Sequence, residues 1–196
     1  MFYKILVKII RVFDFIFYGF RKPDNSIIPK DEGIIVCSNH PGLRDPLFIA
    51  ESIDRPLTFM SKKELFKFKP FGALIKSLGA FPVDRGNNDI AAVKTAIRLL
   101  KGNKALLMFP QGTRSKKEDN RPGKQGAVRL AILTGAKILP VGLSDNNHMF
   151  KKVHINIGEP IDYSSYKRQD LESEDYDCMT KELMDTIYSL AEGDKK

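Results

Sequence analysis

His40 and Asp45, five positions apart in the segment Asn-His-Pro-Gly-Leu-Arg-Asp, are the residues of this chain best suited to acid–base chemistry. On an ideal helix this spacing separates two side chains by about 140°, so they would not meet. The turn expected at Pro41-Gly42 permits a different geometry, in which the carboxylate binds one imidazole nitrogen and fixes the tautomer. The other nitrogen then accepts a proton from an attacking hydroxyl. Taken alone, the pattern also fits a buried histidine in a turn, with Asp45 capping a helix.

Two further segments have the composition of anion-binding loops. Arg85 lies in Gly-Ala-Phe-Pro-Val-Asp-Arg-Gly, where a guanidinium can hold a phosphate through two parallel hydrogen bonds. In Phe-Pro-Gln-Gly-Thr-Arg-Ser, Gly112 permits a tight turn, and backbone N–H groups with Thr113, Arg114 and Ser115 can form an anion-binding pocket. The alternatives are a solvated surface arginine and a basic surface loop.

The composition indicates one globular domain with an anionic partner. The chain has 196 residues, of which 42% are hydrophobic, and its formal net charge is +8. A basic excess suits nucleic acid, anionic lipid, an acidic carrier protein or a phosphorylated substrate. The two cysteines and three histidines show no metal-ligand spacing, so we expect neither a disulfide framework nor a metal site.

Residues 1–22 are predicted to form an amphipathic helix that associates with a membrane, and residues 23–196 the catalytic domain. The first segment is rich in Phe and Ile, but charges interrupt it, which disfavours a spanning helix. Lys4, Lys8 and Arg11 recur on one helical face, while Phe13 and Phe17 belong to the apolar remainder. The alternative is a helix packed on the domain core. No cleavage site of a removable signal peptide follows the segment.

The remaining pattern alternates strands and helices. Strands are expected at 33–38, 56–60, 80–83, 105–109, 137–143 and 153–157, and helices at 45–51, 61–77 (broken at Pro70), 89–101, 123–134 and 170–192. This order predicts an α/β fold with a mostly parallel or mixed central sheet flanked by helices. In such sheets ligands bind beyond the carboxyl ends of the strands, where the three segments above would converge.

These segments, with Ile138–Leu143 as a fourth, resemble the glycerolipid acyltransferase family typified by 1-acyl-sn-glycerol-3-phosphate acyltransferase. All four blocks occur in the family's order. The resemblance implies that His40 and Asp45 are the catalytic pair, and that Arg85, Gln111, Gly112, Thr113 and Arg114 bind the phosphate and the rest of the acceptor. Gln111 departs from the family's usual glutamate and lacks its charge. Gly42 replaces a residue that is often serine.

The resemblance further implies transfer of a fatty acyl chain from acyl-CoA or acyl carrier protein to the free hydroxyl of 1-acyl-sn-glycerol 3-phosphate, forming phosphatidic acid for phospholipid biosynthesis. No cofactor is expected, and the protein should lie on an anionic membrane surface at the cytoplasmic face. We expect direct transfer, because no Gly-x-Ser-x-Gly motif is present and Cys37 lies in an apolar run.

Alternatives within and outside the family remain. The acceptor could instead be glycerol 3-phosphate or another lysophospholipid. A non-catalytic basic protein that binds membranes or nucleic acid is a further alternative, although no nucleic-acid-binding module is recognisable. The segment Lys62–Lys76 alternates lysines with phenylalanines, which suits a membrane interface, an acidic carrier, or a solvated helix with core phenylalanines.

Overall fold

The computed structural model describes residues 2–84, 89–114, 122–144, 150 and 152–193, with side chains from residue 7 onward. Arg85 therefore lies outside the described residues, and so does the side chain of Lys4.

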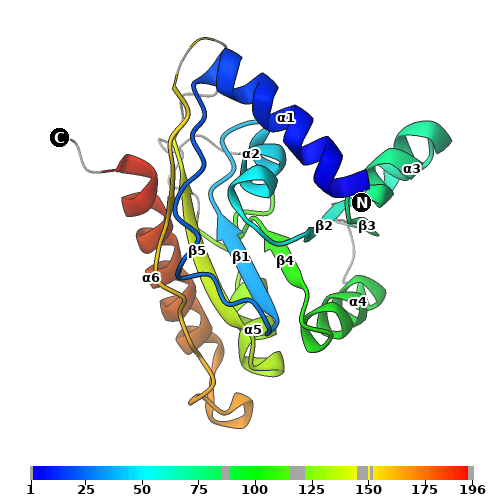
Figure 1. Ribbon diagram of the computed structural model, residues 1–196. Helices are drawn as coiled ribbons and strands as arrows, with labels where there is room; N and C mark the ends of the chain where they lie inside the picture. Colours follow the sequence, from blue (N-terminus) through cyan, green and yellow to red (C-terminus); the bar gives the residue numbers. More distant parts are fainter. Residues whose placement is uncertain (1, 85–88, 115–121, 145–149, 151, 194–196) are drawn as a thin grey trace.

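A six-stranded mixed sheet forms the middle layer of the molecule (Figure 1). In spatial order the strands are β3 (Ala80–Val83), β2 (Leu57–Lys62), β4 (Ala105–Met108), β1 (Ile34–Ser38), β5 (Lys137–Leu143) and β6 (Ile155–Ile157). The first five strands in this order are mutually parallel, and β6 runs antiparallel to β5 at the edge. All five residues of β1 are buried, as expected for a strand in the middle of a sheet that is covered on both faces.

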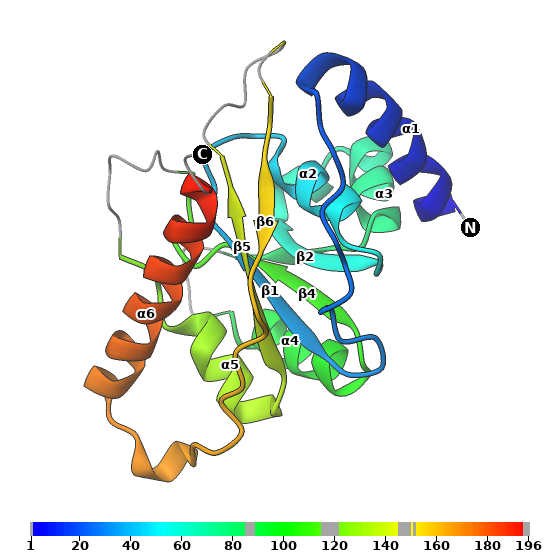
Figure 2. The same ribbon diagram turned by 60° about the vertical axis from the view of Figure 1, so that its left-hand side comes forward.

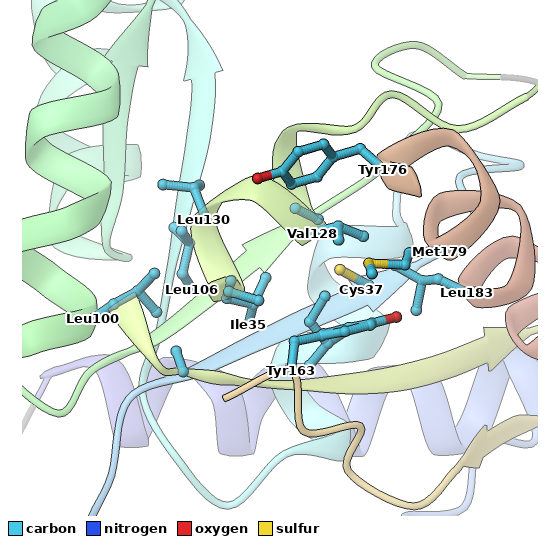
Figure 3. Packing of buried hydrophobic residues seen from close by; sticks show 14 of the residues in the cluster. Ile35, Cys37, Leu100, Leu106, Val128, Leu130, Tyr163, Tyr176, Met179 and Leu183 are labelled. Carbon is cyan, nitrogen blue, oxygen red and sulfur yellow. The ribbon is translucent and has the colours of Figure 1, made fainter. Parts of the chain in front are cut away.

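Helices cover both faces of the sheet (Figures 1 and 2). On one face lie α4 (Ile90–Lys101), α5 (Gly126–Thr134) and α6 (Ser173–Glu192), and on the other lie α1 (Phe2–Tyr18) and α2 (Asp45–Ser52). Successive residues of a strand point to opposite faces. Accordingly, Ile35 and Cys37 of β1 pack among α4, α5 and α6, while Ile34 and Val36 pack with the α1 and α2 side. Figure 3 shows the first of these two cores.

Glycine permits the close approach of α6 to the sheet. A Cβ atom at Gly142 of β5 would lie 2.1 Å from the backbone nitrogen of Ala191 and 2.3 Å from the carbonyl carbon of Leu190. Both are backbone atoms, which cannot move aside as a flexible side chain would. The contact between β5 and α6 therefore depends on a residue without a side chain.

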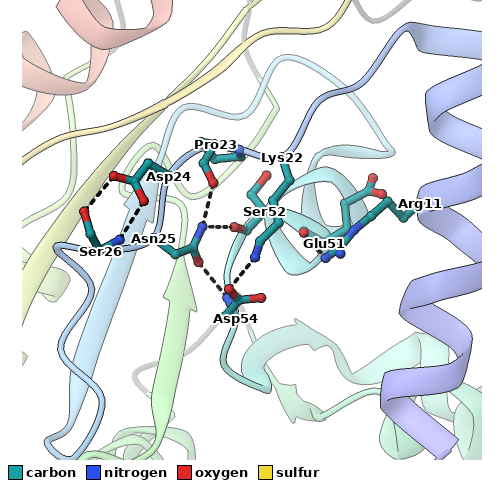
Figure 4. Close-up of polar contacts among 9 residues, drawn as sticks. All are labelled: Arg11, Lys22, Pro23, Asp24, Asn25, Ser26, Glu51, Ser52 and Asp54. Carbon is teal, nitrogen blue, oxygen red and sulfur yellow. Dashed lines mark hydrogen bonds and ion pairs between the residues drawn. The ribbon is translucent and has the colours of Figure 1, made fainter.

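The segment between α1 and β1 is fastened to the end of α2. Figure 4 shows the Asn25 side chain donating to the Ser52 carbonyl (2.8 Å) and accepting from the Asp54 N–H (2.8 Å). Lys22 pairs with Asp54 beside these contacts. Tyr18 and Phe20, at the end of α1 and just after it, are buried core residues. The C-terminal part of α1 is thus integrated into the core.

The predicted α/β fold with a mixed sheet is confirmed. The expected break at Pro70 takes a different form, because residues 61–77 contain the end of β2, a 3-10 helix η1 (Lys63–Phe66) and a separate helix α3 (Lys69–Ser77). Pro70 stands in the first turn of α3, where a missing N–H has no consequence. Among the described residues, no helix combines the length and hydrophobicity needed to cross a membrane.

Candidate active site

The structure brings His40 and Asp45 into direct contact at the carboxyl end of β1. His40 Nδ1 lies 2.7 Å from Asp45 Oδ2, and the same oxygen accepts a 2.7 Å hydrogen bond from the Gly42 N–H. The chain turns at Pro41-Gly42, so that Asp45 returns to the ring as the first residue of α2. Asp45 is fully buried, while the His40 side chain keeps 13% of its surface exposed. The pair therefore has an inner carboxylate and an outer imidazole, whose Nε2 is left to act on a substrate.

Phe109 and Asn39 hold this turn in place, and sequence reasoning had assigned neither to the site. The Phe109 ring stacks on the His40 ring with centroids 4.0 Å apart and planes 16° from parallel. The buried Asn39 side chain donates to the Leu143 carbonyl (2.7 Å) and accepts from the Leu143 N–H (2.8 Å). These contacts tie the end of β1 to the ends of β4 and β5. Asn39 and Phe109 are each the first residue of a motif segment described above, but neither was given a role of its own.

A mainly apolar cavity of about 510 Å³ opens beside His40. It lies beyond the carboxyl ends of β2, β3 and β4, and residues of α4 and α5 also line it. Its apolar lining includes Phe59, Met60, Val83, Val93, Met108 and Ala127. A cavity of this size and character suits a hydrocarbon chain or another apolar group.

Charged side chains border the cavity on two sides. Lys124 lines it next to Gly112, whose backbone has φ +71°, and a Cβ there would meet the Lys124 side chain at 3.2 Å. Asp89 caps α4, and hydrogen bonds from the backbone N–H groups of Asp84 and Ala92 lower the pKa of its carboxyl group. Lys124 is a cation at the site that the sequence analysis did not single out. It follows a Pro-Gly pair and resembles a surface lysine in sequence.

The third block divides between the interior and the surface. Gln111 is buried, and its amide nitrogen donates to the Tyr188 hydroxyl of α6 at 2.9 Å. The other amide atom, Oε1, has no hydrogen-bond partner among the described residues. Gly112 lines the cavity, whereas Thr113 and Arg114 are exposed. Of the predicted acceptor-binding residues, the structure thus places only Gly112 on the cavity wall with His40, and Arg85 lies outside the described residues.

Cys37 is not available as a nucleophile. Its thiol is fully buried among core residues, and burial raises its pKa far above the ordinary value. A thiol that stays protonated does not attack a thioester. Cys37 is therefore a core residue, as its apolar sequence context indicated.

Comparisons with known proteins all identify acyltransferases as similar to this chain. The family described as "Acyltransferase" matches residues 20–144, which include both members of the pair. A 1-acyl-sn-glycerol-3-phosphate acyltransferase of Bacillus subtilis is 34% identical over 154 residues, covering 76% of each chain. One from Borreliella burgdorferi is 29% identical over 170 residues, covering 80% of this chain and 68% of its own. The crystal structure of the 1-acyl-sn-glycerophosphate (LPA) acyltransferase PlsC from Thermotoga maritima superposes with a TM-score of 0.69 at 26% identity, covering 87% of this chain and 69% of the other.

Proposed function

Because this chain belongs to the acyltransferase family and is an O-acyltransferase, we propose that it acylates the free hydroxyl of 1-acyl-sn-glycerol 3-phosphate, with His40 as the general base. The observation that carries the proposal is the 2.7 Å contact between His40 and the buried Asp45 at the edge of an apolar cavity. The relatives share the activity in their names, and the site supplies a base, a carboxylate partner and space for a chain.

The proposed reaction is a direct acyl transfer. His40 Nε2 takes the proton of the acceptor hydroxyl as its oxygen forms a bond to the thioester carbonyl carbon. Asp45 holds the ring and stabilises the imidazolium that results. The tetrahedral intermediate then collapses, the carbon–sulfur bond breaks, and the imidazolium returns its proton to the departing thiolate. The products are the new ester and a free thiol.

The substrates would approach from two sides of the histidine. The cavity of about 510 Å³ accepts an acyl chain. Arg85, Arg114 and Lys124 are the cations proposed to hold the acceptor phosphate, which would orient the hydroxyl towards Nε2. The donor in this proposal is acyl-CoA or acyl carrier protein, and the product is phosphatidic acid for phospholipid biosynthesis.

A continuous outer surface of α1, η1 and α3 is proposed to rest on the membrane. On α1, the side chains of Ile9, Val12, Phe15 and Ile16 are between 60 and 63% exposed. Figures 1 and 2 both show α3 beside the N-terminal half of α1, and α3 adds Phe71 and Leu74, with Phe68 69% exposed just before it. Only Phe66 is half-buried, so core packing does not explain the other phenylalanines of this segment.

Charge supports a bilayer as the occupant of this surface. Exposed lysines surround the apolar side chains of η1 and α3, namely Lys62, Lys63, Lys67, Lys69 and Lys76. Apolar groups entering the acyl region with lysines at anionic headgroups match both properties at once. The two acyl donors are water-soluble cytoplasmic molecules, and we therefore place the protein at the cytoplasmic face.

The decisive experiment is an acyltransfer assay with purified protein, 1-acyl-sn-glycerol 3-phosphate and each donor in turn. His40→Ala should lower kcat by about 10²–10⁴-fold, and Asp45→Asn by about 10³-fold or more, while both keep the wild-type circular dichroism spectrum. A His40→Ala enzyme with near-normal turnover would refute the proposed mechanism. A panel containing glycerol 3-phosphate and other lysophospholipids decides the acceptor.

A further inference from the structure

The catalytic turn is held from outside by α1. In the turn between His40 and Asp45, the Leu43 side chain is 78% exposed and Gly42 has no side chain, so neither side chain anchors the turn. Arg44, directly before Asp45, is the residue that reaches away from the turn into a neighbouring element. Its guanidinium pairs with Asp14 of α1, and it lies 5.1 Å from the centroid of the Tyr18 ring and 5.2 Å from that of Phe13.

Arg44 is the N-cap residue of α2, directly before the helix, but its side chain forms no capping hydrogen bond. Its backbone carbonyl accepts from the N–H groups of Leu47 (2.8 Å) and Phe48 (3.1 Å), but its side chain does not bind the first N–H groups of the helix. Helices usually begin with a short polar residue whose side chain binds the first free N–H groups. Here the side chain is used for the contact with α1 instead. The start of α2, and with it Asp45, is thus anchored to another helix.

The partner of Arg44 is itself completely buried. Asp14 is 0% exposed, and its Oδ1 accepts the hydrogen bond from Arg44. A buried carboxylate is costly unless it is paired, and packing alone would be served better by an apolar residue. Buried ion pairs of this kind are best attested as devices that fix the register of two elements. Here the Asp14–Arg44 pair aligns α1 with the start of α2, and so fixes the position of the residue next to Asp45.

We propose that Asp14 and Arg44 are positioning residues, which couple the seating of α1 to the geometry of the His40–Asp45 pair. This proposal rests on the proposed function, because it assumes that the pair performs the reaction. α1 also carries the apolar surface described above. Acyl transfer would therefore depend on the helix that contacts the membrane, through a defined ion pair.

The test compares turnover with binding and with stability. Asp14→Asn and Arg44→Met should each lower kcat at least about tenfold, since displacements near 1 Å in an active site have effects of this order, while KM stays within about threefold. The double variant should lose no more than the stronger single variant, because both remove the same pair. Assays in mixed detergent micelles remove any dependence on membrane binding.

Ile10→Ala is the matched control. Ile10 lies on α1, four residues before Asp14, and lines a small cavity against Pro46, Leu47 and Ala50 of α2. The substitution loosens the contact between α1 and α2 without altering the Asp14–Arg44 pair. We therefore expect a lower melting temperature with retained kcat. Equal losses of kcat in Ile10→Ala and Asp14→Asn at equal loss of stability would overturn the proposal, as would wild-type kcat in Asp14→Asn. If Asp14→Asn does not fold, Arg44→Met decides by the same comparison.

His40→Ala in the same assay separates the two proposals. An active His40→Ala enzyme would refute the proposed function. An inactive His40→Ala enzyme, together with a fully active Asp14→Asn enzyme, would refute only the positioning role.

Discussion

Glu51 of α2 should make the folded protein less stable as the pH rises, and Glu51→Gln should remove this effect. The Glu51 carboxyl group is buried. Among the described residues, no nitrogen or hydroxyl donor binds either of its oxygens, and none binds Oδ2 of the neighbouring Asp14. Burial raises the pKa of Glu51 well above its ordinary value, and the hydrogen bond to Asp14 and its charge raise that pKa further, against the opposing charges of Arg11 and Arg44. A proton on Glu51, donated to Asp14, gives both carboxyl groups a partner.

The sign and size of the effect follow from proton binding. Above a pH of about 4.3 the unfolded chain releases the Glu51 proton, while the folded chain keeps it. Stability from this group is therefore complete below that pH and decreases by up to about 1.4 kcal/mol per pH unit until the raised folded pKa is reached. Between pH 4.5 and pH 7.5 the loss is at most about 4 kcal/mol. This value is an upper limit, because the positive charges of Arg11 and Arg44 favour the ionised form of Glu51 in the folded protein.

Glutamine keeps the shape and donates to Asp14 without a proton to lose. We expect Glu51→Gln to gain at least about 1 kcal/mol at pH 7.5, or about 2–4 °C in melting temperature for a chain of this size. The gain should vanish near pH 4.5. Thermal and urea unfolding across this pH range measure it, with Glu64→Gln, an exposed carboxyl group, as the control. A gain that is constant or shrinks with rising pH would contradict this account of the cluster.

Three further outcomes are expected. Gly142→Ala should lower the free energy of unfolding by about 1–3 kcal/mol or more, because its Cβ would meet Ala191 at 2.1 Å; Gly126→Ala, with 3.9 Å to its nearest neighbour, should not, and urea titration compares them. Phe68→Ser with Phe71→Ser should weaken binding to anionic vesicles at least about tenfold in flotation, since a buried Phe contributes about 1.5–3 kcal/mol, whereas Leu133→Ser on α5 should not. Val93→Trp, on the cavity wall, should reduce turnover of long acyl donors more than of short ones; equal reduction would place the chain elsewhere.

The sequence predicted the individual elements well because buried strands and amphipathic helices have local periodicities. The run Ile34–Ser38 is apolar throughout, and the helix Ile90–Lys101 starts at a capping aspartate and ends at Gly102. The order of strands in the sheet was beyond this reasoning, since it depends on contacts between distant residues. The division of residues 61–77 into the end of β2, a 3-10 helix and α3 was likewise missed, because the segment was read as one helical pattern.

The site was predicted only where its chemistry is local in the sequence. His40 and Asp45 are joined by one turn, so their spacing was sufficient to suggest the contact. Asn39 acts through Leu143 and Gln111 through Tyr188, and such pairs leave no pattern in one sequence. The hydrogen bond of Gln111 to a neutral hydroxyl does show how an amide fits a buried position where the family usually has a carboxylate, because an amide brings no charge into the interior.

The orientation of α1 is the clearest difference between sequence and structure. Lys4, Lys8 and Arg11 were expected to face headgroups together. Lys8 is exposed, but Arg11 instead points to α2 and donates to the Glu51 carbonyl at 2.6 Å (Figure 4). Asp14, an apparent interruption of an apolar helix, is the buried partner of Arg44. A charge inside an apolar segment was the available signal for that contact.

The buried Asp14 and the exposed apolar side chains of α1 can be explained together. In water, an amphipathic helix lowers its free energy by burying its apolar side and exposing its charges. In the second half of α1 this separation is incomplete, since Asp14 is buried together with Tyr18 while Phe15 and Ile16 are exposed. If a bilayer covers the outer side of α1, as proposed above, it supplies an apolar phase to these exposed side chains at once. In that proposed arrangement, the pairing of Asp14 with Arg44 would hold α1 on α2 with its exposed apolar side towards the bilayer.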